Sequence, residues 1–424
     1  MCGIAGFIHN SISIEESKIR ITKMINIIGH RGPDALCAII GKKFSMATAR
    51  LAIEKIREGE QPIVDENKRY VLSFNGEIFN YKDIILKYSF PKKKVDSEIK
   101  LLAKLFELKG VNFINEIEGQ FAISIYDIVN DKLYLYRDRF GIRPIYYKYQ
   151  NKKFLYSSEI KSIVAFEGVT PKTSLMSIAS TSLFWSNIKN MTSFKDIFQI
   201  PPGNYLIFSN GKLEIKKYWN NPISQNIKKD EIDKKFKYEK LFSLIKDAVK
   251  RQIHGEVGFS SYLSGGIDSS IIAYLLTQIQ KSPIDTFSVE FENKEYDESA
   301  AQQNIKKVIN SNHFSLRISN KDIAENFEKV INHSECHLFR TAPVPMFLLS
   351  KYVKDMGHKV VFTGEGADEI LLGYDLFGEV KIRKFWSKFP SSAIRPKLLK
   401  KLYYYLPQFQ DSRYFEITKE FYKK

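Results

Sequence analysis

The sequence predicts two domains: an α+β domain with antiparallel sheets, followed by an α/β domain with a doubly wound parallel sheet. A length of 424 residues is ordinary for two domains. The first half consists mainly of short β-like runs, whereas the second half alternates strand-like runs with helical patterns. A polar, charged stretch at about residues 220–233 is typical of a linker. We therefore place the domains at about residues 1–215 and about residues 235–424.

The first domain is predicted from β-like runs with helical segments among them. Helical patterns cover about residues 17–28 and 97–108. Turn signals include Asn75-Gly76, Asn130-Asp131 and Asn210-Gly211, dipeptides that favour hairpin turns. The β-like runs that surround them are GIAGFI, SMATARLAI, RYVLSFNGEIF, QFAISIYD, KLYLYRD, PIYYKY, KFLYSSE and YLIFS.

The second domain is predicted from a regular alternation of strands and helices. When a helix connects two strands of the same sheet, the two strands usually run parallel. The strand-like runs are residues 257–263, 286–291 and 358–363, the helical patterns are residues 240–252, 269–278, 298–309 and 344–356, and a basic, helical tail covers residues 380–424.

The composition excludes several classes of protein. A hydrophobic content of 44% and a charged content of 27% are ordinary for a globular protein. No run of about 18 apolar residues is present, so we expect no membrane span. The N-terminus, MCGIAGFIHN, does not resemble a signal peptide, and we expect a cytoplasmic location. The three cysteines form no CxxC pair or Cys/His cluster, which argues against a disulfide framework and a zinc site.

The net charge of +17 does not by itself indicate a nucleic-acid partner. The lysines are scattered along the chain, as expected for solvated surface residues. The positive charge suits a phosphate-bearing substrate without requiring one. We therefore expect small-molecule substrates and no nucleic acid or membrane as partners.

A cysteine at position 2 is chemically unusual. Removal of Met1 would free Cys2 as the first residue and place its thiol beside its own α-amine. That amine has an ordinary pKa of about 7.7–8.0, which suits a base that accepts the thiol proton near neutral pH. Alone, a cysteine at this position is equally compatible with chance, so other segments must decide.

Ordered motifs follow Cys2 and resemble the class II glutamine amidotransferases, whose N-terminal cysteine cleaves glutamine. They are HRGPD at residues 30–34, RLAI at 50–53, FNGEI at 74–78, EGQFA at 118–122, RDRFGIRPIYY at 137–147 and SEIK at 158–161. This resemblance implies a four-layer αββα domain, in which helices cover two stacked antiparallel sheets.

The resemblance implies a role for each residue of the glutamine site. The Asn75 side chain and the Gly76 N–H would stabilise the oxyanion that forms when Cys2 attacks the amide. Arg50 would bind the α-carboxylate of glutamine through a bidentate pair of hydrogen bonds. The remaining residues that the family uses to bind glutamine, including its α-ammonium group, correspond to Leu51, Ala52, Ile53, Glu77 and Asp96.

A second cluster, Ser264-Gly265-Gly266-Ile267-Asp268-Ser269-Ser270, lies between a strand-like run and a helical pattern. This context directs backbone N–H groups and a helix N-terminus towards an anion, and the glycines allow the backbone to approach phosphate. The cluster resembles the pyrophosphate-binding loop of ATP pyrophosphatases, which cleave ATP between the α- and β-phosphates. It is no Walker loop, because the GK[ST] ending is missing.

A third cluster, Thr363-Gly364-Glu365-Gly366-Ala367-Asp368-Glu369, also follows a strand-like run. Ligands of open α/β sheets bind beyond the carboxyl ends of the strands, so both clusters are expected to line one crevice. Asp268 and Asp368 are candidates to hold Mg²⁺ on the pyrophosphate. The alternative is that these acids only cap helices.

The combination of the two halves resembles glutamine-dependent asparagine synthetase. By position, Leu263 and Val289 would contact the adenosine of ATP, and Thr363-Gly364 would lie near the nucleotide. Glu365 would assist the formation of β-aspartyl-AMP from ATP and aspartate, and Arg340 would reach phosphate or the carboxylate substrate. The resemblance leaves open whether the protein forms a homodimer.

Two departures from that family leave alternatives open. The chain has Leu371-Leu372-Gly373-Tyr374 where the family has Phe-Gly-Gly-Tyr, and the family continues beyond residue 424. The acceptor would then be another carboxylate, such as a surface-polysaccharide or peptide precursor, or the protein would retain only glutaminase or interaction functions. A tRNA-modifying enzyme with the same ATP loop is disfavoured, since it needs no glutamine pocket.

Overall fold

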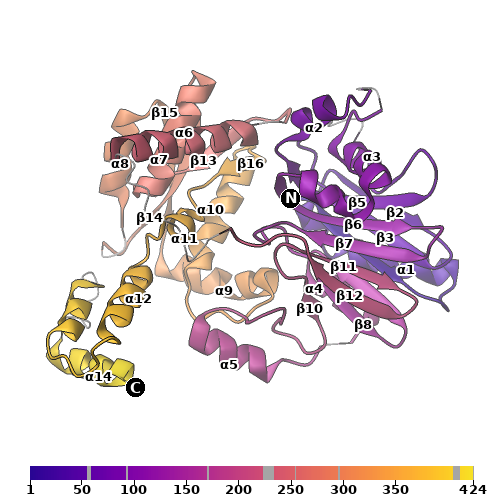
Figure 1. Cartoon of the computed structure of the whole chain (residues 1–424). Coiled ribbons are helices and arrows are strands. Elements are labelled where there is room, and N and C mark those ends of the chain that lie inside the picture. The colour runs from indigo at the N-terminus through magenta and orange to yellow at the C-terminus, as the bar shows by residue number, and fades with distance from the viewer. Residues whose placement is uncertain are drawn as a thin grey trace. The chain divides into compact units, whose positions relative to one another are not determined.

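The structure is a computed structural model that describes residues 1–54, 59–91, 94–169, 171–222, 234–253, 255–294, 297–403 and 411–423. The predicted linker at residues 220–233 lies mostly outside the described residues. The chain forms two compact units (Figure 1). The first unit comprises Met1–Phe259, Val289–Asp297 and Leu316–Val360, and the second comprises Ser260–Ser288, Glu298–Ser315 and Val361–Lys424.

The first unit contains two six-stranded antiparallel sheets, as predicted. One sheet has the order β10-β8-β9-β1-β3-β2 and the other the order β12-β11-β7-β6-β5-β4. The strands of the first sheet are β10 (Phe198–Gln199), β8 (Tyr146–Gln150), β9 (Lys153–Ser157), β1 (Gly3–Ile8), β3 (Phe44–Arg50) and β2 (Ala35–Ile40). Those of the second are β12 (Lys212–Lys217), β11 (Asn204–Ser209), β7 (Lys132–Arg137), β6 (Gly119–Asp127), β5 (Tyr70–Ile78) and β4 (Ile63–Val64).

Helices cover the outer faces of both sheets, which confirms the four-layer αββα arrangement (Figure 1). One apolar cluster lies between the two sheets and includes Ile4 of β1 and Ala122 of β6. The outer face of the first sheet packs on α1 (Ile14–Asn26) and α4 (Ile160–Glu167). The outer face of the second packs on α2 (Tyr81–Lys87), α3 (Glu98–Lys109) and the 3-10 helix η2 (Gly110–Glu116).

The central strands are buried on both faces. Every residue of β1 and of β3 is buried. Side chains of a strand alternate between its two faces, and here both faces are covered, one by the other sheet and one by helices. A continuous apolar run such as GIAGFI therefore forms a strand without the usual alternation of polar and apolar residues.

Turn residues were predicted with mixed success. Asp131 lies at the β6–β7 turn and Asn210-Gly211 at the β11–β12 turn, and all three have a positive φ. The expectation of a turn at Asn75-Gly76 is wrong. Both residues lie inside β5 and pair with Ala122 and Phe121 of β6. The extended pairing with β6 prevails over the local preference of this dipeptide for a turn.

A four-stranded sheet with the order β15-β14-β13-β16 forms the centre of the predicted doubly wound domain. Its strands are β13 (Phe259–Tyr262), β14 (Ile284–Phe291), β15 (Ser311–Ile318) and β16 (Val360–Phe362), and β13 pairs with β14 in parallel. The chain runs outward from β13 to β15 and then returns to the other side of β13. The strand order therefore reverses between β13 and β16, which is where open α/β sheets bind ligands.

Helices connect and follow these strands. Sequence patterns indicated the helices at Lys234–Gln252, Ile267–Gln280, Ser299–Val308 and Pro343–Asp355, but they did not indicate the helix at Asn320–Ser334 or β15. The remaining helices are α6 (Lys234–Gln252), α7 (Ile267–Gln280), α8 (Ser299–Val308), α9 (Asn320–Ser334), α10 (Pro343–Asp355), α11 (Ala367–Leu371), α12 (Asp375–Trp386), α14 (Ser412–Lys423), α5 (Leu175–Phe184), η1 (Gly29–Arg31) and η3 (Arg395–Lys401). Within the described ranges, none of the helices combines the length and the apolar character needed to cross a membrane.

Apolar side chains differ in burial, so their removal should differ in its effect on the free energy of unfolding. Ile123 of β6 is fully buried, whereas Leu86 of α2 is 73% exposed. Ile123→Ala should lower the free energy of unfolding by about 2–5 kcal/mol, because it leaves a cavity in the core. Leu86→Ala should change it by less than about 0.5 kcal/mol. Urea unfolding of the two variants would measure both changes, and equal effects would contradict the packing.

Candidate functional site

Cys2 lies beside the end of β3. The pairing of Gly3 with Ala49 brings the residue before β1 next to the residues that follow β3. The Leu51 N–H donates to Cys2 Sγ at 3.4 Å, and Cys2 Sγ lies 3.8 Å from the Leu51 carbonyl oxygen. Arg31 Nε donates to the Cys2 carbonyl at 3.0 Å. Both the side chain and the backbone of Cys2 are therefore held in place.

The surroundings of the N-terminus favour a neutral amine. Burial, reinforced by the charges of Arg31 and Arg143, lowers the pKa of the Met1 α-amine to about 5. An amine with such a pKa is an unprotonated base at neutral pH.

Asn75 and Gly76 lie in β5, which contacts β1 and β3 of the facing sheet. Asn75 is fully buried, and neither polar atom of its side chain has a hydrogen-bond partner among the described residues. A buried amide without a partner is costly, and such a group is commonly satisfied by a ligand or water. A Cβ atom at Gly76 would lie 2.1 Å from the Gln120 carbonyl oxygen, so only glycine fits the close approach of β5 and β6.

A carboxyl group that the sequence reasoning missed lies near this site. Glu98, the first residue of α3, accepts a hydrogen bond of 2.5 Å from the Ile78 N–H. Burial raises the pKa of Glu98 well above its usual value, and Glu77, Glu54 and Cys2 raise it further. Its position two residues after Asp96 was the available signal, but the sequence does not show which acid turns inward.

Arg50 and Asp96 have protein partners of their own. Arg50 is 8% exposed and donates from Nη2 to the Glu54 carbonyl at 3.0 Å. Asp96 forms an ion pair of 2.9 Å with Lys100. These contacts leave their expected roles towards glutamine as predictions. Of the neighbouring predicted residues, Leu51, Ile53 and Glu77 are half-buried and Ala52 is buried.

The loop after β3 is tied to Asp34 and to Lys359. The Ala52 N–H donates to Asp34 Oδ2 at 2.7 Å, and Lys359 Nζ donates to the same oxygen at 2.8 Å. Burial would raise the pKa of Asp34, but the hydrogen bonds from Lys359 and Ala52 lower it. Asp34 belongs to the HRGPD motif, whose role was not assigned from the sequence.

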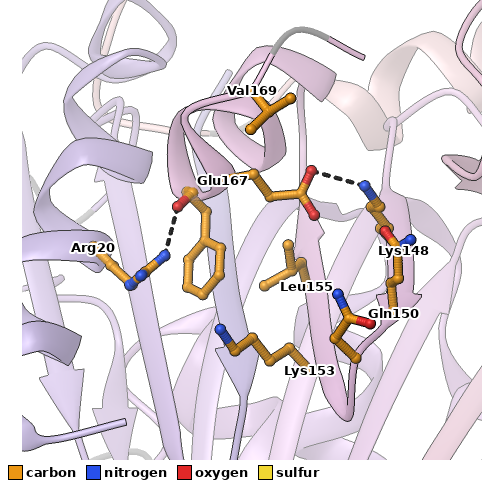
Figure 2. A pocket seen from close by; sticks show the side chains of 9 residues that line it. Arg20, Lys148, Gln150, Lys153, Leu155, Glu167 and Val169 are labelled. Atoms are coloured by element: carbon orange, nitrogen blue, oxygen red, sulfur yellow. Dashed lines mark hydrogen bonds and ion pairs between the residues drawn. The ribbon is translucent and has the colours of Figure 1, made fainter. Parts of the chain in front are cut away.

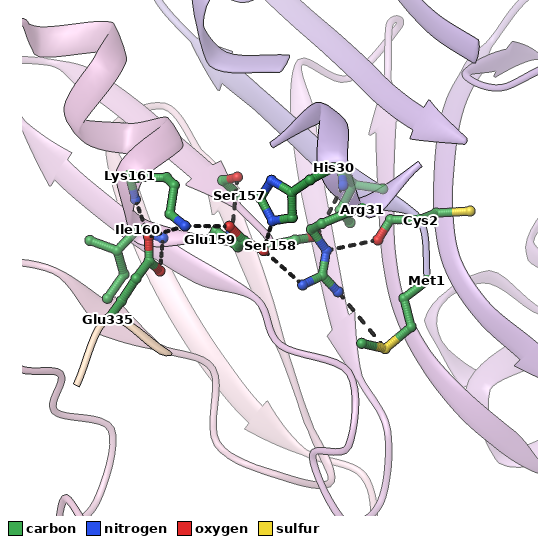
Figure 3. A network of polar contacts seen from close by, with 11 residues as sticks. Met1, Cys2, His30, Arg31, Ser157, Ser158, Glu159, Ile160, Lys161 and Glu335 are labelled. Carbon is green, nitrogen blue, oxygen red and sulfur yellow. Dashed lines mark hydrogen bonds and ion pairs between the residues drawn. The ribbon is translucent and has the colours of Figure 1, made fainter. Parts of the chain in front are cut away.

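A polar network joins the same motif to the start of α4 (Figure 3). Glu159 Oε1 accepts from His30 Nε2 at 2.9 Å and from Arg31 Nη1 at 3.0 Å, and Glu159 Oε2 lies 3.0 Å from Lys161 Nζ. Burial would raise the pKa of Glu159, but the His30 hydrogen bond and the Arg31 charge lower it to about 2. Glu159 is therefore ionised at neutral pH and fixes Arg31, which in turn contacts Cys2.

The loop after β13 adopts the geometry of an anion-binding turn. Gly265 has φ of +85°, and Gly266 precedes the first turn of α7 without a side-chain cap. The Ser264 N–H and hydroxyl contact Ser269 Oγ at 3.1 and 2.9 Å. Ser270 Oγ donates to the Gly266 carbonyl at 2.6 Å. The hydroxyls thus brace the loop, while the N-terminus of α7 points into it.

The loop after β16 packs directly on this turn, as predicted. A Cβ atom at Gly364 would lie 2.8 Å from the Ser269 nitrogen and 3.0 Å from Asp268 Cβ, so glycine is required there. Burial and the charge of Asp368 raise the pKa of Asp268, which indicates that the two carboxyls lie close together. Two adjacent carboxylates beside a turn of this geometry suit Mg²⁺, whose remaining ligands are commonly phosphate and water oxygens. Within the described residues, no group of three or more potential metal ligands is found.

The other residues predicted for the second site lie as follows. Leu263 is buried and its N–H donates to the Phe287 carbonyl, while Val289 and Thr363 are half-buried. Glu365 is exposed. Arg340 is exposed, and its guanidinium carbon lies 5.3 Å from the centre of the Trp185 ring. The roles of all five residues towards ATP and the acceptor remain predictions.

A pocket of about 390 Å³ contains none of the predicted site residues (Figure 2). Lys148 forms an ion pair of 2.7 Å with Glu167 there, and Arg20 donates to the Phe166 carbonyl at 2.8 Å. Most of its charged groups are therefore paired. The lining consists of Arg20, Lys148, Gln150, Asn151, Lys153, Leu155, Phe166, Glu167 and Val169.

Comparisons with known proteins agree with both halves. Residues 1–219 match the family described as glutamine amidotransferase domain, and residues 240–424 match the family described as asparagine synthase. The chain belongs to the glutamine-hydrolysing asparagine synthetase family. Asn75, which has no partner among the described residues, lies in the region that matches the amidotransferase family. The turn after β13 lies in the region that matches the asparagine synthase family.

Individual relatives of the asparagine synthetase family are similar at about 30% identity. A glutamine-hydrolysing asparagine synthetase of Bacillus subtilis is 30% identical over 88% of this chain and 52% of its own length. A protein of Methanocaldococcus jannaschii named for the same activity is 30% identical over 88% of this chain and 76% of its own. The amidase chyE of Penicillium rubens is 29% identical over 89% of this chain and 60% of its own. The chain thus spans about half to three quarters of the length of these relatives.

The low pKa of Glu159 makes a prediction about acid stability. Its folded-state pKa of about 2 lies below the ordinary value of 4.5, so its stabilising contribution is complete above pH 4.5. The contribution is lost as the pH falls from 4.5 towards 2. Glu159→Gln should therefore lower the free energy of unfolding by about 2–3 kcal/mol at pH 7.

Urea unfolding at several pH values would measure this effect. The difference between wild type and Glu159→Gln should shrink as the pH approaches 2. Glu167→Gln, at the other end of α4, is the matched control, because its partly exposed ion pair with Lys148 contributes less. A difference for Glu159→Gln that is the same at pH 7 and pH 3 would contradict the assignment.

Proposed function

We propose that the protein is a glutamine-dependent asparagine synthetase. Glutamine is hydrolysed at Cys2, and the ammonia amidates aspartate that ATP has activated, giving asparagine, AMP, pyrophosphate and glutamate. The observation that carries the proposal is the buried Asn75 amide, which has no partner among the described residues and lies on β5, the strand that contacts β1 directly after Cys2. A hydrolytic site for an amide needs such a preorganised donor, whereas a purely structural strand does not.

In the glutamine half-reaction, the Cys2 thiolate attacks the side-chain amide carbon. The α-amine of Cys2 accepts the thiol proton and returns it to the leaving ammonia. Asn75 Nδ2–H and the Gly76 N–H donate to the oxyanion during attack, and water then releases glutamate from the thioester. Arg50 binds the substrate carboxylate, and Glu77 and Asp96 bind its ammonium, with Leu51, Ala52 and Ile53 forming the adjacent wall.

In the ATP half-reaction, the loop from Ser264 to Ser269 holds the pyrophosphate and Thr363-Gly364 borders the nucleotide. The close approach of Gly364 to Asp268 supports a single crevice for both loops. Asp268 and Asp368 would hold Mg²⁺, which would supply neutralisation of phosphate charge. Leu263 and Val289 contact the adenosine, Glu365 assists the formation of the adenylate, and Arg340 reaches phosphate or the carboxylate that is activated.

A second candidate is amide formation on a carboxylate other than aspartate. The similarity to chyE, which is named an amidase and not an asparagine synthetase, favours this possibility. The glutamine half-reaction is the same in both candidates. Only the acceptor differs.

The nucleophile can be tested directly. Cys2→Ala should reduce glutamate release from glutamine by more than about a thousandfold, because the thioester to Cys2 cannot form. Cys37→Ala is the control, since Cys37 is exposed on β2. Its activity should equal that of the wild type. Persistent glutamine hydrolysis by Cys2→Ala would exclude Cys2 as the nucleophile.

The acceptor and the ATP site can be tested in one assay that follows glutamate and pyrophosphate with and without aspartate. We expect pyrophosphate release to require aspartate. Asp268→Asn should reduce pyrophosphate release by more than about a hundredfold, as expected when a charge-neutralising ligand is lost, and should retain glutamate release. Asp285→Asn, on the neighbouring strand β14, is the control. Glutamate without pyrophosphate would contradict a synthetase, and aspartate-independent pyrophosphate would favour another acceptor.

A further inference from the structure

Glu335 bridges two parts of the chain that match different families. It directly follows α9, in the region that matches asparagine synthase, yet its carboxylate contacts α4, in the amidotransferase region. Glu335 Oε2 accepts from the Ile160 N–H at 2.5 Å, and Oε1 accepts from the Lys161 N–H at 2.6 Å. All of these residues belong to the first compact unit.

The start of α4 depends on this distant carboxylate. The first N–H groups of a helix have no partner within the helix. Glu159 is the N-cap residue but makes no side-chain cap, because its carboxylate binds His30 and Arg31 instead. Glu335 therefore supplies the two acceptors and a negative charge at the positive end of the helix.

Charged and titratable groups surround Glu335 on several elements. Lys161 Nζ lies 3.9 Å from Glu335 Oε1 and 3.0 Å from Glu159 Oε2, so it joins the two acids. His333 of α9 packs edge-on against His30 at 4.8 Å between ring centres. The Glu335 side chain is only 7% exposed, and burial raises its pKa, whereas the hydrogen bonds from the Lys161 and Ile160 N–H groups lower it.

The residues at the start of α4 are connected to Cys2 by two routes (Figure 3). In one, Glu159 binds Arg31, which donates to the Cys2 carbonyl. In the other, Ser158 exchanges two hydrogen bonds with Ile4: the Ser158 N–H donates to the Ile4 carbonyl at 2.9 Å, and the Ile4 N–H donates to Ser158 Oγ at 3.0 Å. A shift at the start of α4 would therefore displace the residues on both sides of the Cys2–Gly3 peptide.

We infer that Glu335 is a positioning residue through which α9 controls the placement of Cys2. The inference rests on the proposed function of Cys2 as the glutamine nucleophile. When Glu335, at the end of α9, keeps its carboxylate against α4, Arg31 and Ile4 keep Cys2 aligned. When α9 moves away, two N–H groups of α4 lose their acceptors and the alignment of Cys2 relaxes. Glutamine hydrolysis thereby responds to the state of the asparagine synthase region.

The test compares Glu335→Gln and Glu335→Ala with the wild type in the full chain. Glu335→Gln keeps the volume of the side chain but turns an NH₂ group towards a backbone donor. Glu328→Gln is the matched control, since Glu328 is an exposed acid on the same helix. Three quantities are measured: the kcat and KM of glutamate release, the rate of Cys2 alkylation by iodoacetamide, followed by peptide mass spectrometry, and the midpoint of urea unfolding.

We expect both Glu335 variants to lower kcat by roughly tenfold, the factor that about 1.4 kcal/mol of transition-state stabilisation represents. KM should change by less than about twofold, because the groups that bind glutamine are not displaced. The alkylation rate of Cys2 should change in both variants and stay at the wild-type value in Glu328→Gln. Combining Glu335→Gln with Arg31→Lys should give less than the product of the separate effects on kcat, since both act through one network.

The outcomes separate this inference from the proposed function. Unaltered kcat and alkylation rate with a lower unfolding midpoint would mean that Glu335 only stabilises the fold, and the inference would be overturned. Independent effects of Glu335→Gln and Arg31→Lys would also overturn it. If the wild type released no glutamate, the proposed function would fail, while the alkylation rates would still test whether Glu335 positions Cys2.

Discussion

The central position of β1 in its sheet is the constraint on which the amidotransferase site depends. β1 pairs with β3 on one side and β9 on the other, and it is buried between a second sheet and a layer of helices. A chain terminus is usually free to move, because few contacts hold it. Here the first strand is paired on both sides and fully buried, so the residue that precedes it is restricted to a place beside the end of β3.

The neighbouring elements use this fixed point. β3 brings Arg50 and Leu51 to Cys2, the facing sheet brings Asn75 and Gly76, and the segment before α4 holds Arg31 through Glu159. The burial that creates the site also shapes its electrostatics. Burial lowers the pKa of the Met1 α-amine and raises the pKa of the Glu98 carboxyl. The protonation states of these groups therefore depend on packing as well as on residue type.

The second site follows a different logic, in which topology replaces burial. The strand order reverses between β13 and β16, so the loops after these two strands meet although about a hundred residues separate them. Gly364 is required at this contact because a side chain would collide with the backbone of the first loop. The two glycine-containing clusters are thus halves of a single structural feature.

Several features were recognisable before the structure. The order of the motifs after Cys2 indicated the family, the alternation of strands and helices indicated the parallel sheet, and the glycine clusters indicated the loops. The turn expected at Asn75-Gly76 was wrong, because pairing with β6 outweighs a local preference. Glu98 and Glu335 were not found, since nothing in their sequence neighbourhood shows that Glu98 turns towards Ile78 or that Glu335 reaches Ile160.

The sequence by itself determined which chemical groups are available: a cysteine at position 2, an amide beside a glycine, and two glycine-containing loops with their carboxylates. These are local patterns of residue types, and local patterns can be read from a chain. The tertiary structure alone decided which polar groups lose their partners and which gain distant ones. Within the described part of the chain Asn75 is left without a partner, whereas Ile160 and Lys161 acquire one that lies 175 and 174 residues away in the sequence. Such pairings depend on long-range packing, in which burial makes each polar group either satisfied or available.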